Sequence, residues 1–139
     1  MTPIPFEIPS IVLADLLHKY PTKGKNSDIG KIAVEIAKEY FKQVYSNPQF
    51  PITDKGIDLT VINGSNVEHF EIKGTEDNKI SFPKLKVSGK PCYNHLTTGK
   101  TTLLRITKIR QKEVNIYLLK HGEHFTLAPE DRWKFVEIK

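Results

Sequence analysis

The chain has 139 residues, a single cysteine and a formal net charge of +5 at neutral pH. This length predicts one domain over residues 1–139 with one core, and the single Cys92 excludes an internal disulfide and a cysteine-based metal site. No apolar run reaches the roughly 18 residues of a membrane span, and the N-terminus lacks the pattern of a signal peptide. A cytoplasmic protein is therefore expected, and its basic charge favours a polyanionic partner.

The first third of the chain predicts an extended segment followed by two helices. Three prolines exclude a helix over residues 1–10, which we expect to form an extended N-terminal arm. A short helix is predicted over residues 11–19. A longer helix is predicted over residues 29–45, where apolar residues recur at helical spacing, with Ser27 or Asp28 as its N-cap.

Residues 57–73 predict a β-hairpin. Two runs of alternating apolar and polar residues flank Asn63-Gly64-Ser65-Asn66, a sequence typical of a tight turn. Counting outward from this turn places Asp58 opposite Glu71, with Lys73 on the same face. The other face is apolar throughout and is expected to pack on the core, so the three charged side chains should be presented together.

The rest of the chain predicts a second hairpin after an irregular segment. Prolines and glycines break any long element in residues 83–100, where a short helix over 93–96 is expected. Strands are predicted over 101–109 and 114–120, and a helical turn over 129–136. This order of elements predicts an α/β domain with a mixed central sheet flanked by helices.

Asp58 and Glu71 form the candidate reactive centre. Opposed cross-strand Cβ atoms lie about 4.5–5.5 Å apart, and two carboxylates at that spacing raise each other's pKa unless a cation relieves the repulsion. A hard divalent cation, which prefers oxygen ligands, would relieve it. Lys73 could neutralise the pair, orient a water molecule or hold a phosphate. The alternative is a charged surface hairpin in which Lys73 simply pairs with Glu71.

The spacing of Asp58 and Glu71-Ile72-Lys73 resembles the motif of the PD-(D/E)xK nuclease superfamily. The stretch over residues 70–75 is also similar to the nuclease-like domains at the C-terminus of the NO VEIN protein group. The chain departs from the superfamily pattern at Ile57, where a proline usually precedes the aspartate.

The resemblance implies a restriction-endonuclease-like core and a Mg²⁺- or Mn²⁺-dependent nuclease that hydrolyses DNA. Asp58, Glu71 and the backbone carbonyl of Ile72 would then bind the metal. Lys73 would orient or deprotonate the attacking water.

The superfamily also often carries a helical glutamate shortly after a glycine. Gly30 and Glu35 match that pattern, and Glu35 would bind the metal directly or through water. The angular position of Glu39 lies closer to the apolar face of the helix over 29–45. Helical geometry alone therefore favours Glu39, whereas the resemblance favours Glu35, which we prefer.

Positive charge is concentrated in one stretch of the chain. Residues 79–112 contain nine lysines and arginines and no acidic residue. Such a stretch suits contact with a phosphate backbone, and an ordinary solvated lysine-rich surface is the alternative. The residues expected to contact DNA are Lys84, Lys86, Lys90, Lys100 and Arg105.

Two functions other than catalysis are compatible with the sequence. One is a nuclease-like fold that binds nucleic acid without cutting it, and the other is a protein-interaction subunit that docks through residues 1–10. The presence of Asp58, Glu71 and Lys73 favours the enzyme. A homodimer is expected, because so small a domain offers little surface for DNA.

Overall fold

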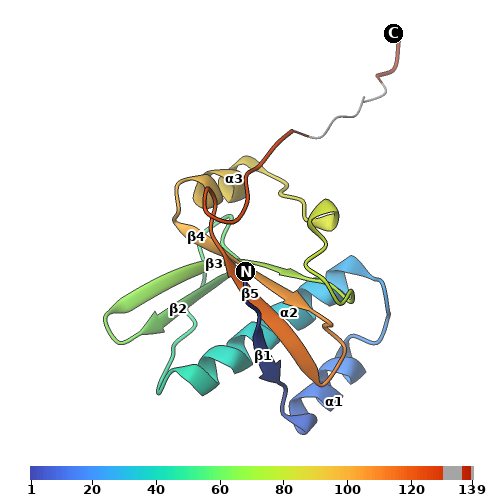
Figure 1. Ribbon diagram of the computed structural model, residues 1–139, viewed down its shortest axis with the longest axis vertical. Coiled ribbons are helices and arrows are strands. Elements are labelled where there is room, and N and C mark those ends of the chain that lie inside the picture. The colour runs from blue at the N-terminus through green and yellow to red at the C-terminus, as the bar shows by residue number, and fades with distance from the viewer. Residues whose placement is uncertain (130–135, 139) are drawn as a thin grey trace.

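The computed structural model describes residues 1–129 and 136–138 (Figure 1). The helices are α1 (Ser10–Lys19), α2 (Asn26–Val44) and α3 (Lys90–Thr97), with a short 3₁₀ helix η1 (Phe82–Lys84). The strands are β1 (Ile4–Glu7), β2 (Leu59–Asn63), β3 (Asn66–Gly74), β4 (Thr101–Thr107) and β5 (Glu113–Leu119). Within the described ranges, no helix combines the length and apolar character needed to span a membrane.

The five strands form one mixed sheet in the order β1-β5-β4-β3-β2. Strands β3 and β4 are parallel, and every other neighbouring pair is antiparallel. The parallel pair requires a crossover connection, which contains η1 and α3. The structure therefore confirms the predicted α/β class with a mixed central sheet and flanking helices.

The sheet carries apolar residues on both faces, and this divides the core in two. The larger cluster joins α1 and α2 to one face, with Ile32, Ile36 and Phe41 of α2 fully or almost fully buried. A smaller cluster covers the other face around Leu96, Leu103 and Leu119. The second cluster is built by α3, by the segment around η1 and by the chain after β5, and it determines the surroundings of the candidate site.

Helices α2 and α3 each begin three residues earlier than predicted. Helix α2 begins at Asn26, so Ser27 and Asp28 lie inside its first turn and Lys25 is the N-cap. An acidic residue in the first turn is favourable because it faces the positive end of the helix dipole. Helix α3 begins at Lys90, since Pro91 is well tolerated in a first turn.

The predicted N-terminal arm is instead an integral edge strand. Strand β1 pairs with β5, and Phe6 and Ile8 are buried in the larger cluster. Proline lacks a backbone donor but is tolerated on an edge strand, which explains how this proline-rich segment joins the sheet. The strands predicted over 101–109 and 114–120 are confirmed as β4 and β5. The helical turn predicted over 129–136 falls mostly on residues 130–135, outside the described residues.

Candidate active site

The hairpin β2–β3 has the predicted register. The pairs run from Asn63↔Asn66 at the turn to Leu59↔Phe70 at the far end. Asp58 lies just beyond this last pair. Its N–H donates to the Phe70 carbonyl at 3.0 Å, and its carboxylate oxygen Oδ2 accepts from the Ile72 N–H at 2.8 Å. The side chain is exposed, so one carboxylate oxygen is anchored on β3 while the residue stays accessible from solvent.

Glu71 is buried, contrary to the expectation that it lies on an open face. Only 3% of the residue is exposed. The smaller hydrophobic cluster covers this face of the sheet, and Glu71 lies beside Leu103 of the neighbouring strand β4. Its Oε1 lies 3.5 Å from Lys73 Nζ, whereas Oε2 is buried without a hydrogen-bond partner.

This environment changes the acidity of Glu71. Burial, reinforced by the negative charge of Asp58, raises the pKa of Glu71 from 4.5 to about 7, although Lys73 acts in the opposite direction. The side chain is therefore substantially protonated at neutral pH unless a further positive charge approaches. A bound cation would restore the charged form, as binding to carboxylates generally does.

One pocket brings together the residues predicted to carry the chemistry. It has a volume of about 550 Å³, and its lining includes Glu35, Asp58, Glu71, Ile72 and Lys73. These residues come from α2, from the loop before β2 and from β3. Its remaining lining residues are Tyr20, Ser27, Gly30, Lys31, Val34, Ser88 and Cys92.

The structure distinguishes the two candidate helical acids. Glu35 lines the pocket that contains Asp58 and Glu71, and it forms an ion pair with Lys38 at 3.6 Å. Glu39 lines a separate pocket between α1 and α2, which Glu35 also reaches, and pairs with Lys42 at 3.3 Å. Glu35 therefore shares a pocket with Asp58 and Glu71, whereas Glu39 does not, and the role of Glu35 stays a prediction.

The donor set suits a cation that keeps much of its own water. Across residues 1–129 and 136–138, no three His, Cys, Asp or Glu side chains lie close enough together to hold a metal ion. Mg²⁺ commonly takes only one or two carboxylates and retains several waters. Asp58, Glu71 with its unpartnered Oε2, and the Ile72 carbonyl are the groups that could hold such a cation.

Sequence reasoning did not place Cys92 in this site. It reaches the pocket because the loop before β2 docks against the start of α3. Gly56 permits this approach, since a Cβ there would lie 2.8 Å from Pro91 Cβ, and His95 Nε2 lies 3.1 Å from the Lys55 carbonyl. Burial, together with the charge of Glu71, raises the pKa of the Cys92 thiol, which disfavours a thiolate nucleophile.

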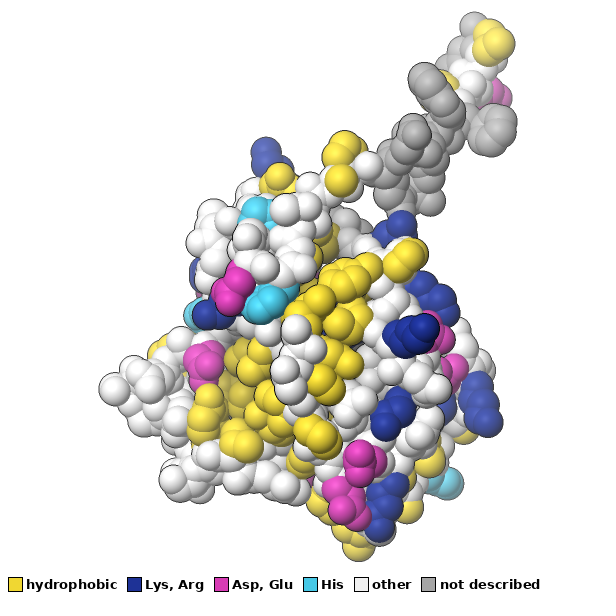
Figure 2. Space-filling view, viewed as in Figure 1, with side chains coloured by type: hydrophobic (Ala, Val, Ile, Leu, Met, Phe, Trp, Pro, Cys, Tyr) yellow, Lys and Arg dark blue, Asp and Glu magenta, His cyan; other side chains and the backbone are white. Residues whose placement is uncertain are grey.

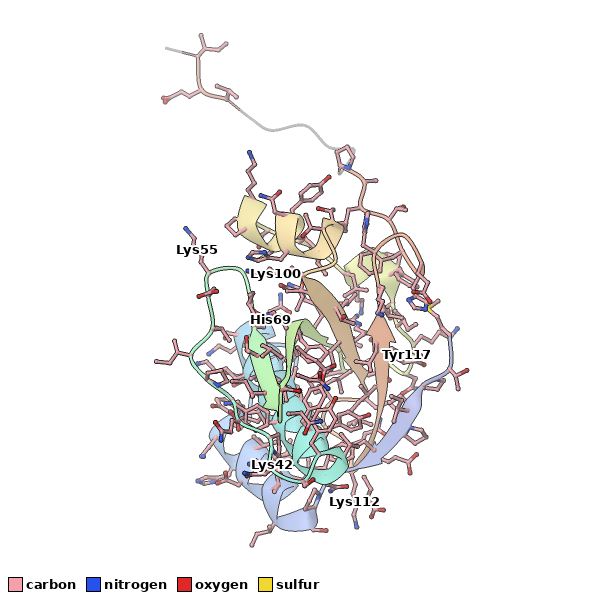
Figure 3. All side chains as sticks on the ribbon, turned by 90° about the vertical axis from the view of Figure 1, so that its left-hand side faces the viewer. Lys42, Lys55, His69, Lys100, Lys112 and Tyr117 are labelled. Atoms are coloured by element: carbon pink, nitrogen blue, oxygen red, sulfur yellow. The ribbon has the colours of Figure 1, made fainter. Side chains whose placement is uncertain are left out.

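Four of the five basic residues predicted to contact DNA are exposed, namely Lys84, Lys86, Lys90 and Lys100. Lys84 forms an ion pair with Asp77 at 2.8 Å. Figure 2 shows basic side chains along the edge of the molecule where η1 lies, beside a hydrophobic centre. Figure 3 shows Lys100 near α3, at the opposite end of the molecule from Lys42 and Lys112.

The fifth basic residue, Arg105, is not placed to contact DNA. It is 2% exposed, and its guanidinium donates hydrogen bonds to the carbonyls of Gly74 at 3.1 Å and Ile80 at 2.9 Å. Its side chain lies on the covered face of β4, beside Lys73 in the parallel pair. Arg105 thus fixes the chain after Lys73, and we correct its predicted role accordingly.

Comparisons with protein-family models, curated proteins and solved structures find no match for this chain. The resemblance to PD-(D/E)xK nucleases therefore rests on the sequence motif alone.

Proposed function

We propose that this protein is a metal-dependent nuclease that hydrolyses phosphodiester bonds in DNA. One observation carries the proposal: the almost fully buried Glu71, with an unpartnered oxygen, shares a pocket with Asp58 and Lys73. A buried acid without a full set of partners is destabilising, and such groups concentrate at functional sites. A site that receives a cation and a phosphate accounts for this cost.

The metal site would consist of Asp58, Glu71 and the backbone carbonyl of Ile72. The hydrogen bond from the Ile72 N–H holds the Asp58 carboxylate against β3, so the two acids are positioned before any ligand arrives. The chemistry that Mg²⁺ or Mn²⁺ supplies when bound is neutralisation of phosphate charge and a lowered pKa for water. The restriction-endonuclease-like core remains part of this proposal, and the positions of Asp58 directly before β2 and of Glu71 in β3 support it.

Lys73 is the residue best placed to act on the reacting phosphate. It is partly buried, and its Nζ lies 3.5 Å from Glu71 Oε1. An ammonium held in a partly dry site stabilises negative charge that develops on the phosphate and orients the water that attacks phosphorus. That attack forms a new phosphorus–oxygen bond and breaks the bond to the leaving sugar oxygen. The attacking water releases a proton to solvent, and the leaving sugar oxygen takes one up to become a hydroxyl group.

Glu35 supports the reaction from α2. It lines the same pocket as Asp58 and Glu71, and it would accept a hydrogen bond from a water molecule there. The exposed lysines near η1 and α3 would attract the DNA backbone toward the pocket. Their contribution should weaken as salt concentration rises.

A plasmid-nicking assay with Mg²⁺ or Mn²⁺ tests the proposal. The wild-type protein is expected to nick supercoiled DNA, and Asp58→Ala should reduce nicking by at least about 100-fold. Asp54→Ala is the matched control, because Asp54 is exposed in the same loop but lines none of the pockets that contain Glu71. Equal nicking by a folded Asp58→Ala protein would exclude the assigned site.

A second candidate is a nucleic-acid-binding module with no catalytic activity. It is favoured by the absence of a three-acid cluster among the residues that the structure describes. DNA binding in metal-free buffer that Asp58→Ala leaves unchanged, together with no nicking, would support this module over the nuclease.

A further inference from the structure

A second, smaller pocket adjoins the proposed reactive centre. It has a volume of about 160 Å³, and Glu71 and Lys73 line both pockets. The small pocket occupies a gap in the smaller hydrophobic cluster, and its remaining walls are largely apolar. These walls are formed by Phe82, Leu85, Lys86, Val87, Leu96, Leu103, Phe125, Thr126 and Leu127.

The size of this pocket limits what it can hold. A cavity of about 150 Å³ accommodates benzene, whereas sites for larger organic ligands usually have about 300–1,000 Å³. The pocket therefore fits one six-membered ring and is too small for a whole nucleotide. Its polar end is formed by Glu71 and Lys73, and the rest of its surface suits a flat, weakly polar ring.

Aromatic and basic residues surround the same pocket. Phe82, in η1, lines the pocket and is 40% exposed, so its ring is accessible from solvent. Phe125 contributes a second aromatic ring to the lining, and Lys86 contributes a positive charge. Aromatic rings beside basic residues are the combination with which proteins bind unpaired bases of a nucleic acid strand.

We propose that this pocket binds one unstacked pyrimidine base of the DNA strand whose phosphate lies at Asp58 and Glu71. The inference rests on the proposed nuclease function, because Glu71 and Lys73 line both the proposed reactive centre and this pocket. A base inside a duplex must leave its stack to enter such a pocket, at a cost in energy. The preferred substrate is therefore single-stranded DNA, or duplex DNA with an unpaired pyrimidine next to the cleaved bond.

Binding of a labelled oligothymidylate, measured by fluorescence anisotropy in EDTA, tests the proposal. A strand of the same length made of abasic residues has the same phosphates without bases. The wild-type protein is expected to bind oligothymidylate about tenfold more tightly than the abasic strand, a ratio typical of base–aromatic stacking. Equal affinity for the two strands, or no binding of either, would overturn the proposal.

Val87→Phe fills the pocket and should abolish the preference while leaving affinity for the abasic strand unchanged. Val44→Phe is the matched control, since Val44 is exposed at the end of α2 and lines neither pocket. If Val87→Phe fails to fold, Phe82→Ala replaces it in the same binding assay, because this exposed side chain can be shortened with little effect on the core. An unchanged preference in a folded variant of either kind would show that the pocket does not receive the base.

The two proposals can fail separately. Binding in EDTA needs neither metal nor cleavage, so a base preference that depends on Val87 would survive failure of the nicking assay. Conversely, if the protein nicks plasmid DNA but binds the two strands equally, the proposed nuclease function stands and the proposed base pocket is excluded.

Discussion

Glu71 links the stability of this domain to its proposed chemistry. Its carboxyl group is buried beside Asp58, and Lys73 compensates only part of the cost. The folded state therefore binds a proton at Glu71 more tightly than the unfolded state does. Such a residue contributes most to stability below its ordinary pKa, and the contribution is lost as pH rises through its folded-state pKa.

The first prediction concerns the pH dependence of unfolding. In EDTA, the free energy of unfolding of the wild type should fall between about pH 4.5 and pH 7, because of Glu71. The loss is on the order of 3 kcal/mol or less. Glu71→Gln should remove this pH-dependent part of the free energy of unfolding and make the protein more stable than wild type at pH 8. Urea unfolding at several pH values measures both effects.

Glu113→Gln is the matched control for that measurement, because Glu113 is an exposed glutamate at the start of β5. Indistinguishable pH profiles for wild type and Glu71→Gln would contradict the buried, proton-binding role of Glu71.

The second prediction separates catalysis from metal binding at Lys73. Lys73→Met should reduce nicking by about 100-fold or more, because the charge that stabilises the phosphate is removed. Metal binding should persist, since the carboxylates remain. Lys79→Met, which alters an exposed lysine in the following turn, should leave nicking near the wild-type rate. A Lys73→Met protein that nicks as well as wild type would remove Lys73 from the mechanism.

At the scale of elements, the close approach of β3 to α2 sets the position of the strand that carries Glu71 and Lys73. Gly74 ends β3 directly after Lys73, and a Cβ at this position would lie 3.0 Å from Ala33 Cβ and in collision with Ile109 Cδ1. A larger residue requires the end of the Ile109 side chain to move and forces its Cβ tightly against Ala33 of α2. The carbonyl of the same glycine accepts a hydrogen bond from buried Arg105.

The third prediction follows from this packing. Gly74→Ala should lower the free energy of unfolding by about 1–3 kcal/mol, the usual cost of overpacking a core. Gly30→Ala is the matched control within α2: no atom lies within 4 Å of the added Cβ, so helix propensity should raise stability by up to about 1 kcal/mol. Denaturant unfolding measures the stability of both variants. A Gly74→Ala protein as stable as wild type would contradict the close approach of β3 to α2.

The sequence predicted those elements whose determinants are local. Alternation around Asn63-Gly64-Ser65-Asn66 was sufficient for the register of β2–β3, and apolar periodicity was sufficient for most of α2. Strand β1 was missed because its partner β5 begins more than 100 residues later. No local pattern distinguishes an extended arm from an edge strand whose partner is so distant.

In the candidate site, too, the features that depend on local sequence were predicted and those that depend on distant segments were not. The grouping of Asp58, Glu71 and Lys73 follows from hairpin geometry, and the structure brings them together with Glu35. The burial of Glu71 could not be predicted, because the residues that cover it belong to the crossover, to β4 and to the chain after β5. Arg105 was assigned to the surface for the same reason, since charge alone does not indicate that a side chain is covered.

At the scale of the whole molecule, two clusters on opposite faces of one sheet create the proposed centre. The larger cluster fixes α2, and with it Glu35, against the sheet. The smaller cluster buries Glu71 and leaves the gap in which we place a base.

The homodimer and the DNA partner expected from the sequence stay predictions. Sedimentation of the free protein and of its DNA complex would test them.

Calorimetric titration of Mg²⁺ and Mn²⁺ into wild-type, Asp58→Ala and Asp54→Ala proteins tests the central claim most directly. The account predicts binding to wild type and Asp54→Ala, with proton release near pH 7 as Glu71 ionises, and loss of binding in Asp58→Ala. The contrary result is a wild-type protein that binds neither ion even with DNA present. Asp58 and Glu71 would then be a charged feature of the hairpin with no metal to hold.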